Sequence, residues 1–319
     1  MVGSNTYSYS AYGLRIKSAV RLPGFVEIEI GDDSEADVEI FHKKITDRDL
    51  HRYFAAADTF KAAECDVRVS QNAMCFIYPK TGTILVSGGN SVAVDVRAGE
   101  PVEDLVPYLT GYVLAVLLHQ RNFLVLHASV VLLNGAGVGF LGAKGQGKST
   151  LAASLEVSGN RLVSDDLLPI VFRNDGVFAL PGYPQIKLFE DSVTAVGETP
   201  SRLPAVHRNN TKYSFSCTQF SNESIPLTAL YVLNIADDIS IDEISLTQAF
   251  IEATKHTIVS YYLRESASFE WHFEKCQNLV HSVPFFALNR PHDFGRINEV
   301  SEALKQHVDE FLTGRPPLG

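Results

Sequence analysis

Cysteine is scarce in this sequence, and the few cysteines present are scattered. The 319 residues contain four of them, Cys65, Cys75, Cys217 and Cys276. Their spacing excludes a zinc framework built from paired cysteines, and their small number excludes a disulfide scaffold. Because disulfides are rare in reducing compartments, this cysteine usage favours a cytoplasmic protein.

Basic charge and long apolar runs are also in short supply. The 27 Lys and Arg residues are outnumbered by 37 Asp and Glu residues, which gives a formal net charge of −10. Proteins that bind nucleic acid or anionic membranes usually carry a basic face, so neither partner is expected. The most apolar helical stretch, residues 112–118, is far shorter than the roughly 20 residues of a membrane span. The first residues lack the basic and apolar segments of a secretory signal.

The remaining composition is that of a packed globular protein, with 45% hydrophobic and 20% charged residues. At roughly 150 residues per domain, the length predicts about two domains. We expect residues 1–98 to form a smaller, β-rich α/β domain, a substrate platform or lid, and residues 99–319 to form the second domain. Short β-rich runs separated by turn residues indicate the β-rich domain at residues 1–98. The strands are predicted at residues 6–18, 36–42, 66–70, 72–78, 83–86 and 91–96.

The second domain alternates predicted strands and helices, which indicates an α/β fold. Asn134-Gly135 is a strong signal for a tight turn between two strands. Ser245 and Gln248 form a capping box at the start of a helix. Further helices are predicted at residues 101–119, 269–281 and 297–312, and strands at 123–133, 137–141 and 228–235.

A glycine-rich segment between a predicted strand and a predicted helix matches the phosphate-loop (P-loop, or Walker A) pattern. Glycines let backbone N–H groups approach phosphate oxygens, Lys148 places a charge on the phosphates, and the Ser149 hydroxyl can bind Mg²⁺. The start of the following helix adds its positive end. We therefore predict a site for ATP or another nucleoside triphosphate with Mg²⁺, rather than a structural glycine-rich turn. Its residues are Gly142, Ala143, Lys144, Gly145, Gln146, Gly147, Lys148, Ser149 and Thr150.

Two adjacent carboxylates, Asp165 and Asp166, end the predicted strand that follows this helix. An acid beside a phosphate loop can coordinate Mg²⁺ or act as a catalytic base. Adjacent strand residues point to opposite faces, so the two acids should have different roles. The pair Asp237-Asp238 also follows an apolar strand, and it reads either as a turn or as a second acidic site. His127, in a predicted strand, is either a hydrogen-bonded core residue or a functional one.

The order of three elements resembles the HPr kinase/phosphorylase superfamily. They are the strand with Leu126-His127-Ala128, the phosphate loop, and the strand that ends in Asp165-Asp166. The resemblance implies a P-loop kinase core like the nucleotide-binding half of phosphoenolpyruvate carboxykinase. It implies that Lys148 contacts phosphate, that Ser149 and Asp166 hold Mg²⁺, that Asp165 is the base, and that His127 tunes that base. Family members are often oligomers, which implies a homo-oligomer.

One downstream segment departs from the HPr enzymes. Their Glu-x-Arg-Gly-x-Gly signature is replaced by residues 181–188, Pro-Gly-Tyr-Pro-Gln-Ile-Lys-Leu. The chain is in this respect more similar to the kinases found beside lasso-peptide biosynthesis genes, which phosphorylate a serine, reportedly the C-terminal one, of a precursor peptide. Lys187, Lys212 and Arg290 are either cationic groups beside the phosphates or ordinary surface charges.

Three functions follow from these observations. The first is a Mg²⁺- and ATP-dependent kinase that acts on a serine hydroxyl of a peptide or small protein. The second is a kinase for free serine or another small hydroxyl metabolite. The third is a nucleotide-binding regulator without transfer activity, although a regulator has no need of the acid pair.

Overall fold

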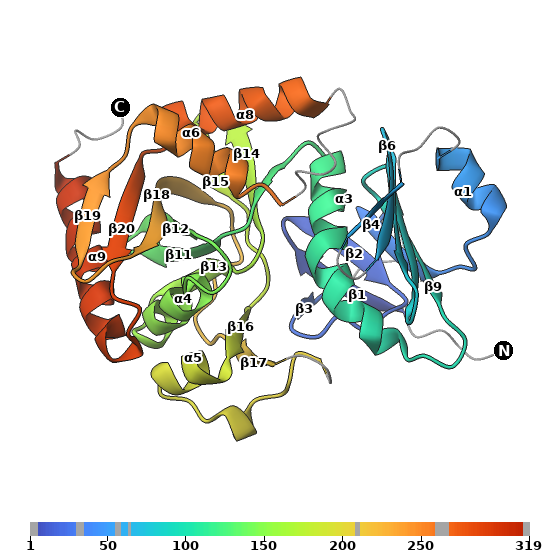
Figure 1. The fold of residues 1–319 in the computed structure, drawn as a ribbon, viewed down its shortest axis with the longest axis horizontal. Helices are drawn as coiled ribbons and strands as arrows, with labels where there is room; N and C mark the ends of the chain where they lie inside the picture. The colour runs from blue at the N-terminus through green and yellow to red at the C-terminus, as the bar shows by residue number, and fades with distance from the viewer. Residues whose placement is uncertain are drawn as a thin grey trace. The chain divides into compact units, whose positions relative to one another are not determined.

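The computed structural model describes residues 6–29, 35–54, 59–62, 65–207, 211–258 and 268–314. The chain forms two compact units (Figure 1). Unit 1 comprises residues 1–125 and 258–274, and unit 2 comprises residues 126–257 and 275–319. Mixed α/β structure with large sheets is present in both, as the sequence predicts.

Unit 1 is built around one twisted sheet whose strand order is β3-β1-β2-β4-β9-β8-β7-β6-β5. The β2–β4 and β4–β9 pairs are parallel, and the other pairs are antiparallel. The strands are β1 (Tyr7–Ala11), β2 (Leu14–Ser18), β3 (Val26–Glu27), β4 (Val38–His42), β5 (Thr59–Lys61), β6 (Asp66–Ser70), β7 (Ala73–Tyr78), β8 (Gly82–Ser87) and β9 (Ser91–Val96).

The runs predicted at residues 36–42, 66–70, 72–78, 83–86 and 91–96 are strands with small shifts in their ends, and the run at 6–18 forms two strands, β1 and β2. The short strands β3 and β5 and one helix were not predicted. Helix α1 (Asp47–Phe54) is short and polar, and Phe54 is its one buried residue. A single turn or two of helix with so little apolar surface has no clear periodic signal. Its Phe54 packs with Ala73 and Leu85 of the sheet, so tertiary contact stabilises it.

A mostly buried helical stretch of 19 residues, Val102–Gln120, also belongs to unit 1. It consists of η1 (Val102–Leu105), α2 (Val106–Tyr108), the π-helical η2 (Leu109–Val113) and α3 (Leu114–Gln120). Its length and apolar character would allow it to cross a membrane, but its burial is typical of the core helix of a soluble protein.

The division between the units lies after Val125, not between residues 98 and 99 as predicted from the sequence. The reason is packing: α3 lies against β8, and the Gln120 side chain accepts a 2.9 Å hydrogen bond from the backbone N–H of Gly89. Strand β10 (Leu124–Leu126) contains the division. The strand predicted at residues 123–133 is interrupted at His127 and Ala128, between β10 and β11 (Ser129–Leu133).

Unit 2 contains a sheet in the order β14-β15-β18-β12-β11-β13, with β20 beside β18 and β19 beside β20. Strand β18 is parallel to both β12 and β20. A separate antiparallel hairpin is formed by β16 and β17. The bounds are β12 (Ala136–Leu141), β13 (Arg161–Ser164), β14 (Leu168–Arg173), β15 (Gly176–Ala179), β16 (Gln185–Phe189), β17 (Lys212–Ser216), β18 (Ile225–Ile235), β19 (Ser240–Glu243) and β20 (Phe285–Arg290).

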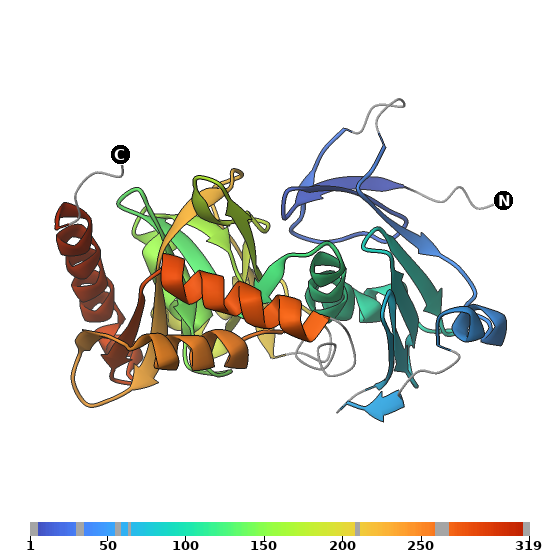
Figure 2. The ribbon, with the colours of Figure 1, turned by 90° about the horizontal axis from the view of Figure 1, so that it is seen from above.

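Helices pack on this sheet through apolar side chains. Leu151 and Leu155 of α4 and Leu304 and Val308 of α9 share one core with Tyr231 of β18. Helix α6 and the unit 2 part of α8 lie side by side (Figures 1 and 2). The helices are α4 (Lys148–Val157), α5 (Glu190–Ala195), η3 (Pro200–Arg202), α6 (Leu246–Lys255), α8 (Ser268–Ser282), η4 (Phe294–Arg296) and α9 (Ile297–Thr313).

Local sequence signals in unit 2 are confirmed. Asn134 and Gly135 have φ angles of 52° and 82°, the left-handed values that a type I′ hairpin turn needs. Both hydrogen bonds of the Ser245–Gln248 capping box are present. Asp237 and Asp238 lie in an exposed turn between β18 and β19, which confirms the interpretation as a turn.

Candidate phosphate-binding site

The phosphate loop connects β12 to α4, as predicted. Gly147 is the N-cap of α4 and has a φ of 78°. This left-handed backbone angle favours glycine, and a Cβ atom there would lie 2.7 Å from Nη2 of Arg290, so the Arg290 guanidinium would have to shift. The Arg290 guanidinium donates to the carbonyl of Gln146 and thereby ties β20 to the loop.

Lys148 is the first residue of α4, and its side chain is almost completely buried. Its Nζ donates to the Gly142 carbonyl at 2.8 Å and to that of Ala143 at 3.4 Å. Burial lowers the pKa of Lys148, because a charged ammonium is poorly solvated there. A phosphate group would supply the opposite charge that a buried ammonium favours.

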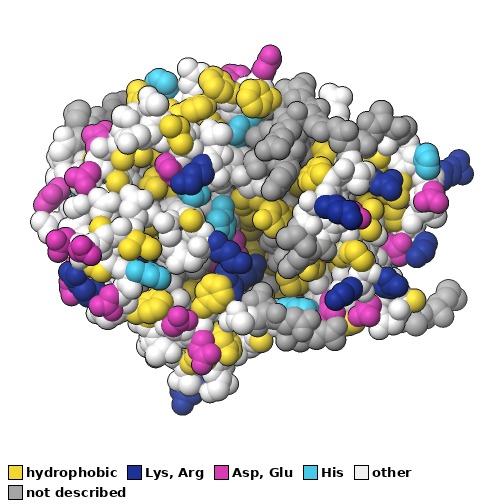
Figure 3. Space-filling view, viewed as in Figure 1, with side chains coloured by type: hydrophobic (Ala, Val, Ile, Leu, Met, Phe, Trp, Pro, Cys, Tyr) yellow, Lys and Arg dark blue, Asp and Glu magenta, His cyan; other side chains and the backbone are white. Residues whose placement is uncertain are grey.

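A cavity of about 300 Å³ lies over this loop. From the loop and α4 it is lined by Lys144, Gly145, Gly147, Lys148, Ser149 and Thr150. Gly142, Ala143 and Gln146 are not among the lining residues and instead shape the loop: the Gln146 side chain accepts a hydrogen bond from the Ala143 N–H at 2.5 Å. Basic side chains gather near the middle of the face shown in Figure 3.

The two aspartates occupy different positions, as predicted, but not through strand alternation. Strand β13 ends at Ser164, before both acids. Asp165 is 6% exposed, and its Oδ1 accepts hydrogen bonds from Ser149 Oγ at 2.9 Å and Ser129 Oγ at 2.6 Å. Asp166 has a φ of 65°, a left-handed conformation that turns it away from Asp165 and into the cavity lining. Such a backbone conformation is uncommon for a residue other than glycine and occurs often at functional sites.

The charges around the two carboxylates differ as well. Burial, reinforced by the neighbouring Asp166, raises the pKa of Asp165. Burial would also raise the pKa of Asp166, but the cations Lys187 and Lys212 outweigh it and hold the Asp166 pKa below its usual range. Lys187 Nζ lies 3.3 Å from Asp166 Oδ2. Of the two carboxyl groups, Asp166 is therefore the one whose surroundings favour the ionised form.

His127 lies beside Asp166 rather than in the middle of a strand. Its Nδ1 is 2.9 Å from the Asp166 carbonyl oxygen, which can only accept, so Nδ1 carries the hydrogen. Burial and the charge of Lys148 lower the pKa of His127. A neutral ring bonded in this way has its Nε2 lone pair available as an acceptor. His127 also lines the cavity.

Three cations from different strands meet at the cavity. Lys187 comes from β16, Lys212 from β17 and Arg290 from β20, and all three line it. Lys187 is buried, which would lower its pKa, but Tyr183 and Asp166 outweigh burial and raise it. Of the two interpretations that the sequence left open, the structure thus supports cationic groups beside the predicted phosphates.

The donor atoms beside the loop suit Mg²⁺. This ion prefers oxygen ligands and is commonly held by one or two carboxylates together with substrate phosphates and water. Ser149 Oγ and Asp165 Oδ1 are such oxygens, and they already lie 2.9 Å apart. Within the described part of the chain, the hydrogen-bond donors to Asp165 are hydroxyl and amide groups, and the positive charge of Lys212 also acts on this carboxylate.

Some residues that line the cavity were not predicted from the sequence as site residues. Phe294 and Ile297 enter from the η4–α9 junction, and Asp191 and Ser192 enter from α5. None of them belongs to a motif, because each is contributed by a separate element. A signal existed only for Asp293, whose spacing to Gly295 fits an N-cap: its Oδ1 accepts from the Gly295 N–H at 2.8 Å.

Comparisons with known proteins add little to this geometry. No family model matches the chain, and no curated protein matches it. Among solved structures, the chain is similar to the Hpr(Ser) kinase/phosphatase from Coxiella burnetii, with 12% sequence identity and a TM-score of 0.34. The match covers 59% of this chain and 97% of that protein. A similarity at this level carries no argument about activity.

Proposed function

We propose that this protein is a Mg²⁺-dependent phosphotransferase that moves the γ-phosphate of ATP, or of another nucleoside triphosphate, to an alcohol. The observation that carries the proposal is the assembly of one cavity from a phosphate loop, Lys148, Ser149 and an ionised Asp166. In-line transfer needs positioning, charge neutralisation and a nearby carboxylate for the attacking hydroxyl. These requirements match the groups that line the cavity.

The geometry favours one division of labour between the two acids, the reverse of the one implied by the resemblance. Asp165 is hydrogen-bonded to Ser149 and does not line the cavity, so we assign it to the metal side. Asp166 lines the cavity and stays ionised, so we assign it as the base that accepts the hydroxyl proton. His127 holds the Asp166 backbone, and Lys187 holds its side chain.

The acceptor is proposed from the sequence motifs. Their similarity to the kinases of lasso-peptide clusters supports a serine hydroxyl on a peptide or small protein. The basic side chains Lys187 and Lys212 beside Asp166 would suit an acceptor that brings a negative group, such as a C-terminal carboxylate, to this place.

Transfer of label from γ-labelled ATP tests the function. The chain would be incubated with Mg²⁺ and either short peptides ending in serine or free serine and other small alcohols. Labelled phosphoserine in a peptide is the expected result. Label on a small alcohol alone would support the metabolite kinase instead. Tight ATP binding with transfer to none of these acceptors would favour a regulator.

Two lysine variants control this experiment. Lys148→Ala should abolish labelling, because it removes the charge beside the phosphates. Lys305→Ala should label normally, because Lys305 lies on α9, pairs with Glu302 and does not line the cavity. Undiminished labelling by Lys148→Ala would contradict the phosphate-loop assignment.

A further inference from the structure

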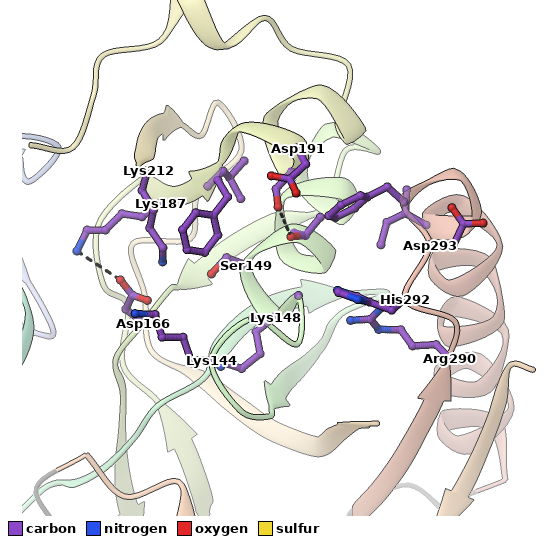
Figure 4. A pocket seen from close by; sticks show the side chains of 18 of the residues that line it. Lys144, Lys148, Ser149, Asp166, Lys187, Asp191, Lys212, Arg290, His292 and Asp293 are labelled. Carbon is purple, nitrogen blue, oxygen red and sulfur yellow. Dashed lines mark hydrogen bonds and ion pairs between the residues drawn. The ribbon is translucent and has the colours of Figure 1, made fainter. Parts of the chain in front are cut away.

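The cavity has two chemically different sides. Figure 4 shows Asp166, Lys187 and Lys212 on one side, and Arg290, His292 and Asp293 on the other, with Lys148 and Ser149 between them. The first side holds the acid and the cations proposed for transfer. The second side contains Phe294 and Ile297, which follow Asp293 along the chain and also line the cavity. A triphosphate on the loop therefore has one end near each side.

The Phe294 side is built to present an aromatic ring. Asp293 caps η4 through its 2.8 Å hydrogen bond from Gly295, which fixes the turn that carries Phe294. Short helix α5 packs against both α4 and η4, so the wall around this ring is formed by separate elements. Phe294 remains 37% exposed, although most large apolar side chains of unit 2 are buried.

A second phenylalanine of the cavity is less available. The ammonium of Lys212 lies 5.1 Å above the centre of the Phe189 ring and occupies that face. The ring of Phe294 has the imidazole of His292 as a neighbour. The two ring centres are 6.2 Å apart and the ring planes are tilted by 51°, so the rings are not stacked face to face. Of the two rings, Phe294 is the better surface for a flat ligand.

We propose that the nucleoside of the phosphate donor binds at this side, with its base against the ring of Phe294. The inference rests on the proposed function. It fixes the direction of the donor: the triphosphate runs from Phe294 along the loop, past Lys148 and Ser149, to a γ-phosphate beside Asp166, Lys187 and Lys212. The carboxylate of Asp293, which is exposed and lies on the Phe294 side of the cavity (Figure 4), disfavours terminal phosphate there.

The test compares ATP with inorganic tripolyphosphate, which has the phosphate chain but no nucleoside. Dissociation constants would be measured by calorimetry with Mg²⁺ for the full chain and for Phe294→Ala. Stacking of a base on an aromatic side chain contributes about 1–3 kcal/mol, so Phe294→Ala should weaken ATP binding roughly 5- to 150-fold. Binding of tripolyphosphate should not change, which also shows that the variant is folded.

Two further variants complete the design. Phe294→Tyr keeps an aromatic face and should restore ATP binding. Phe273→Ala removes another exposed phenylalanine, one that does not line the cavity, and should change neither constant. The inference would be overturned if Phe294→Ala weakened the binding of ATP and of tripolyphosphate equally, or weakened the binding of neither.

The wild-type chain separates the two proposals. If it binds tripolyphosphate but binds ATP no more tightly, the proposed nucleoside site at Phe294 is wrong, while the proposed phosphate site is supported. If it binds neither ligand, the proposed function fails, and this inference fails with it.

Discussion

Both units bury ionisable side chains, but several of those in unit 2 gather at a cavity, whereas the buried histidines of unit 1 do not line it. In unit 2, Lys148 and Arg290 are almost completely buried and line one cavity, and the equally buried Asp165 accepts a hydrogen bond from Ser149 of its lining. In unit 1, His119 and His272 are equally buried, yet His119 packs against Trp271 with ring centres 5.3 Å apart and lines no part of this cavity. Burial lowers the pKa of both histidines to about 4. A perturbed pKa therefore marks burial in both units, and only the convergence on a cavity marks a site.

The largest expected effect is on transfer in unit 2. Asp166→Asn should slow phosphoryl transfer roughly 100- to 10,000-fold, the usual contribution of a general base, while ATP affinity stays nearly unchanged. Single-turnover assays measure the rate of transfer, and calorimetry measures the ATP affinity. Asp238→Asn, in the exposed turn after β18, is the matched control and should be as active as wild type. If Asp165→Asn shows this pattern and Asp166→Asn does not, our assignment of the acids is reversed.

Binding should respond to a different buried group. Lys148→Ala removes a charged hydrogen-bond donor, a change that costs about 1.5–3 kcal/mol and predicts a roughly 10- to 150-fold rise in the ATP dissociation constant. Calorimetry would measure this constant for Lys148→Ala and Lys305→Ala side by side. An unchanged constant for Lys148→Ala would place the phosphates elsewhere.

A buried acid of unit 2 that lies outside the cavity sharpens the comparison. Glu156 of α4 accepts hydrogen bonds from the backbone N–H groups of Thr218 and Gln219 at 2.7 and 2.9 Å. Glu156→Ala leaves both donors without this partner, so the free energy of unfolding should fall by about 2 kcal/mol. Urea unfolding measures it. Glu156→Gln keeps an acceptor oxygen, so its free energy of unfolding should fall by less. A fall as large as that of Glu156→Ala would contradict the hydrogen-bond explanation.

The smallest effect per side chain is expected in unit 1 and depends on pH. The pKa of His119 and His272 is about 4 in the folded chain, against about 6.5 when unfolded, so the unfolded chain binds more protons between these values. Stability should therefore fall as pH drops below about 6.5, by roughly 1 kcal/mol for each histidine between pH 7 and pH 5.5.

One fluorophore reports on this prediction. Trp271 is the single tryptophan of the chain and lies beside His119 in unit 1, so its fluorescence follows urea unfolding there. His119→Leu should reduce the pH dependence, while His51→Gln, at an exposed position on α1, should preserve it. A pH dependence that survives His119→Leu in full would assign it to other groups.

Local patterns in the sequence were enough to predict a glycine-rich turn between a strand and a helix at residues 142–150. Residues 142–150 are contiguous, and a strand, a glycine-rich turn and a helix start each depend on neighbouring residues. The same holds for the Asn134-Gly135 turn and for the helix predicted at residues 297–312, which the structure has as α9 (Ile297–Thr313). The short polar helix α1 and the strands between residues 168 and 189 carried no comparable signal.

The tertiary structure alone decided which distant residues join the loop. Arg290 reaches it because β20 lies beside β18, which in turn lies beside β12. Lys187 and Lys212 come together because β16 and β17 pair, and Phe294 enters from the far end of the chain. Sequence order contains no distance between such elements, since sheet pairing and helix packing set it. The sequence by itself therefore determined the glycine-rich turn and the position of the acid pair after it, whereas the fold determined which acid lines the cavity.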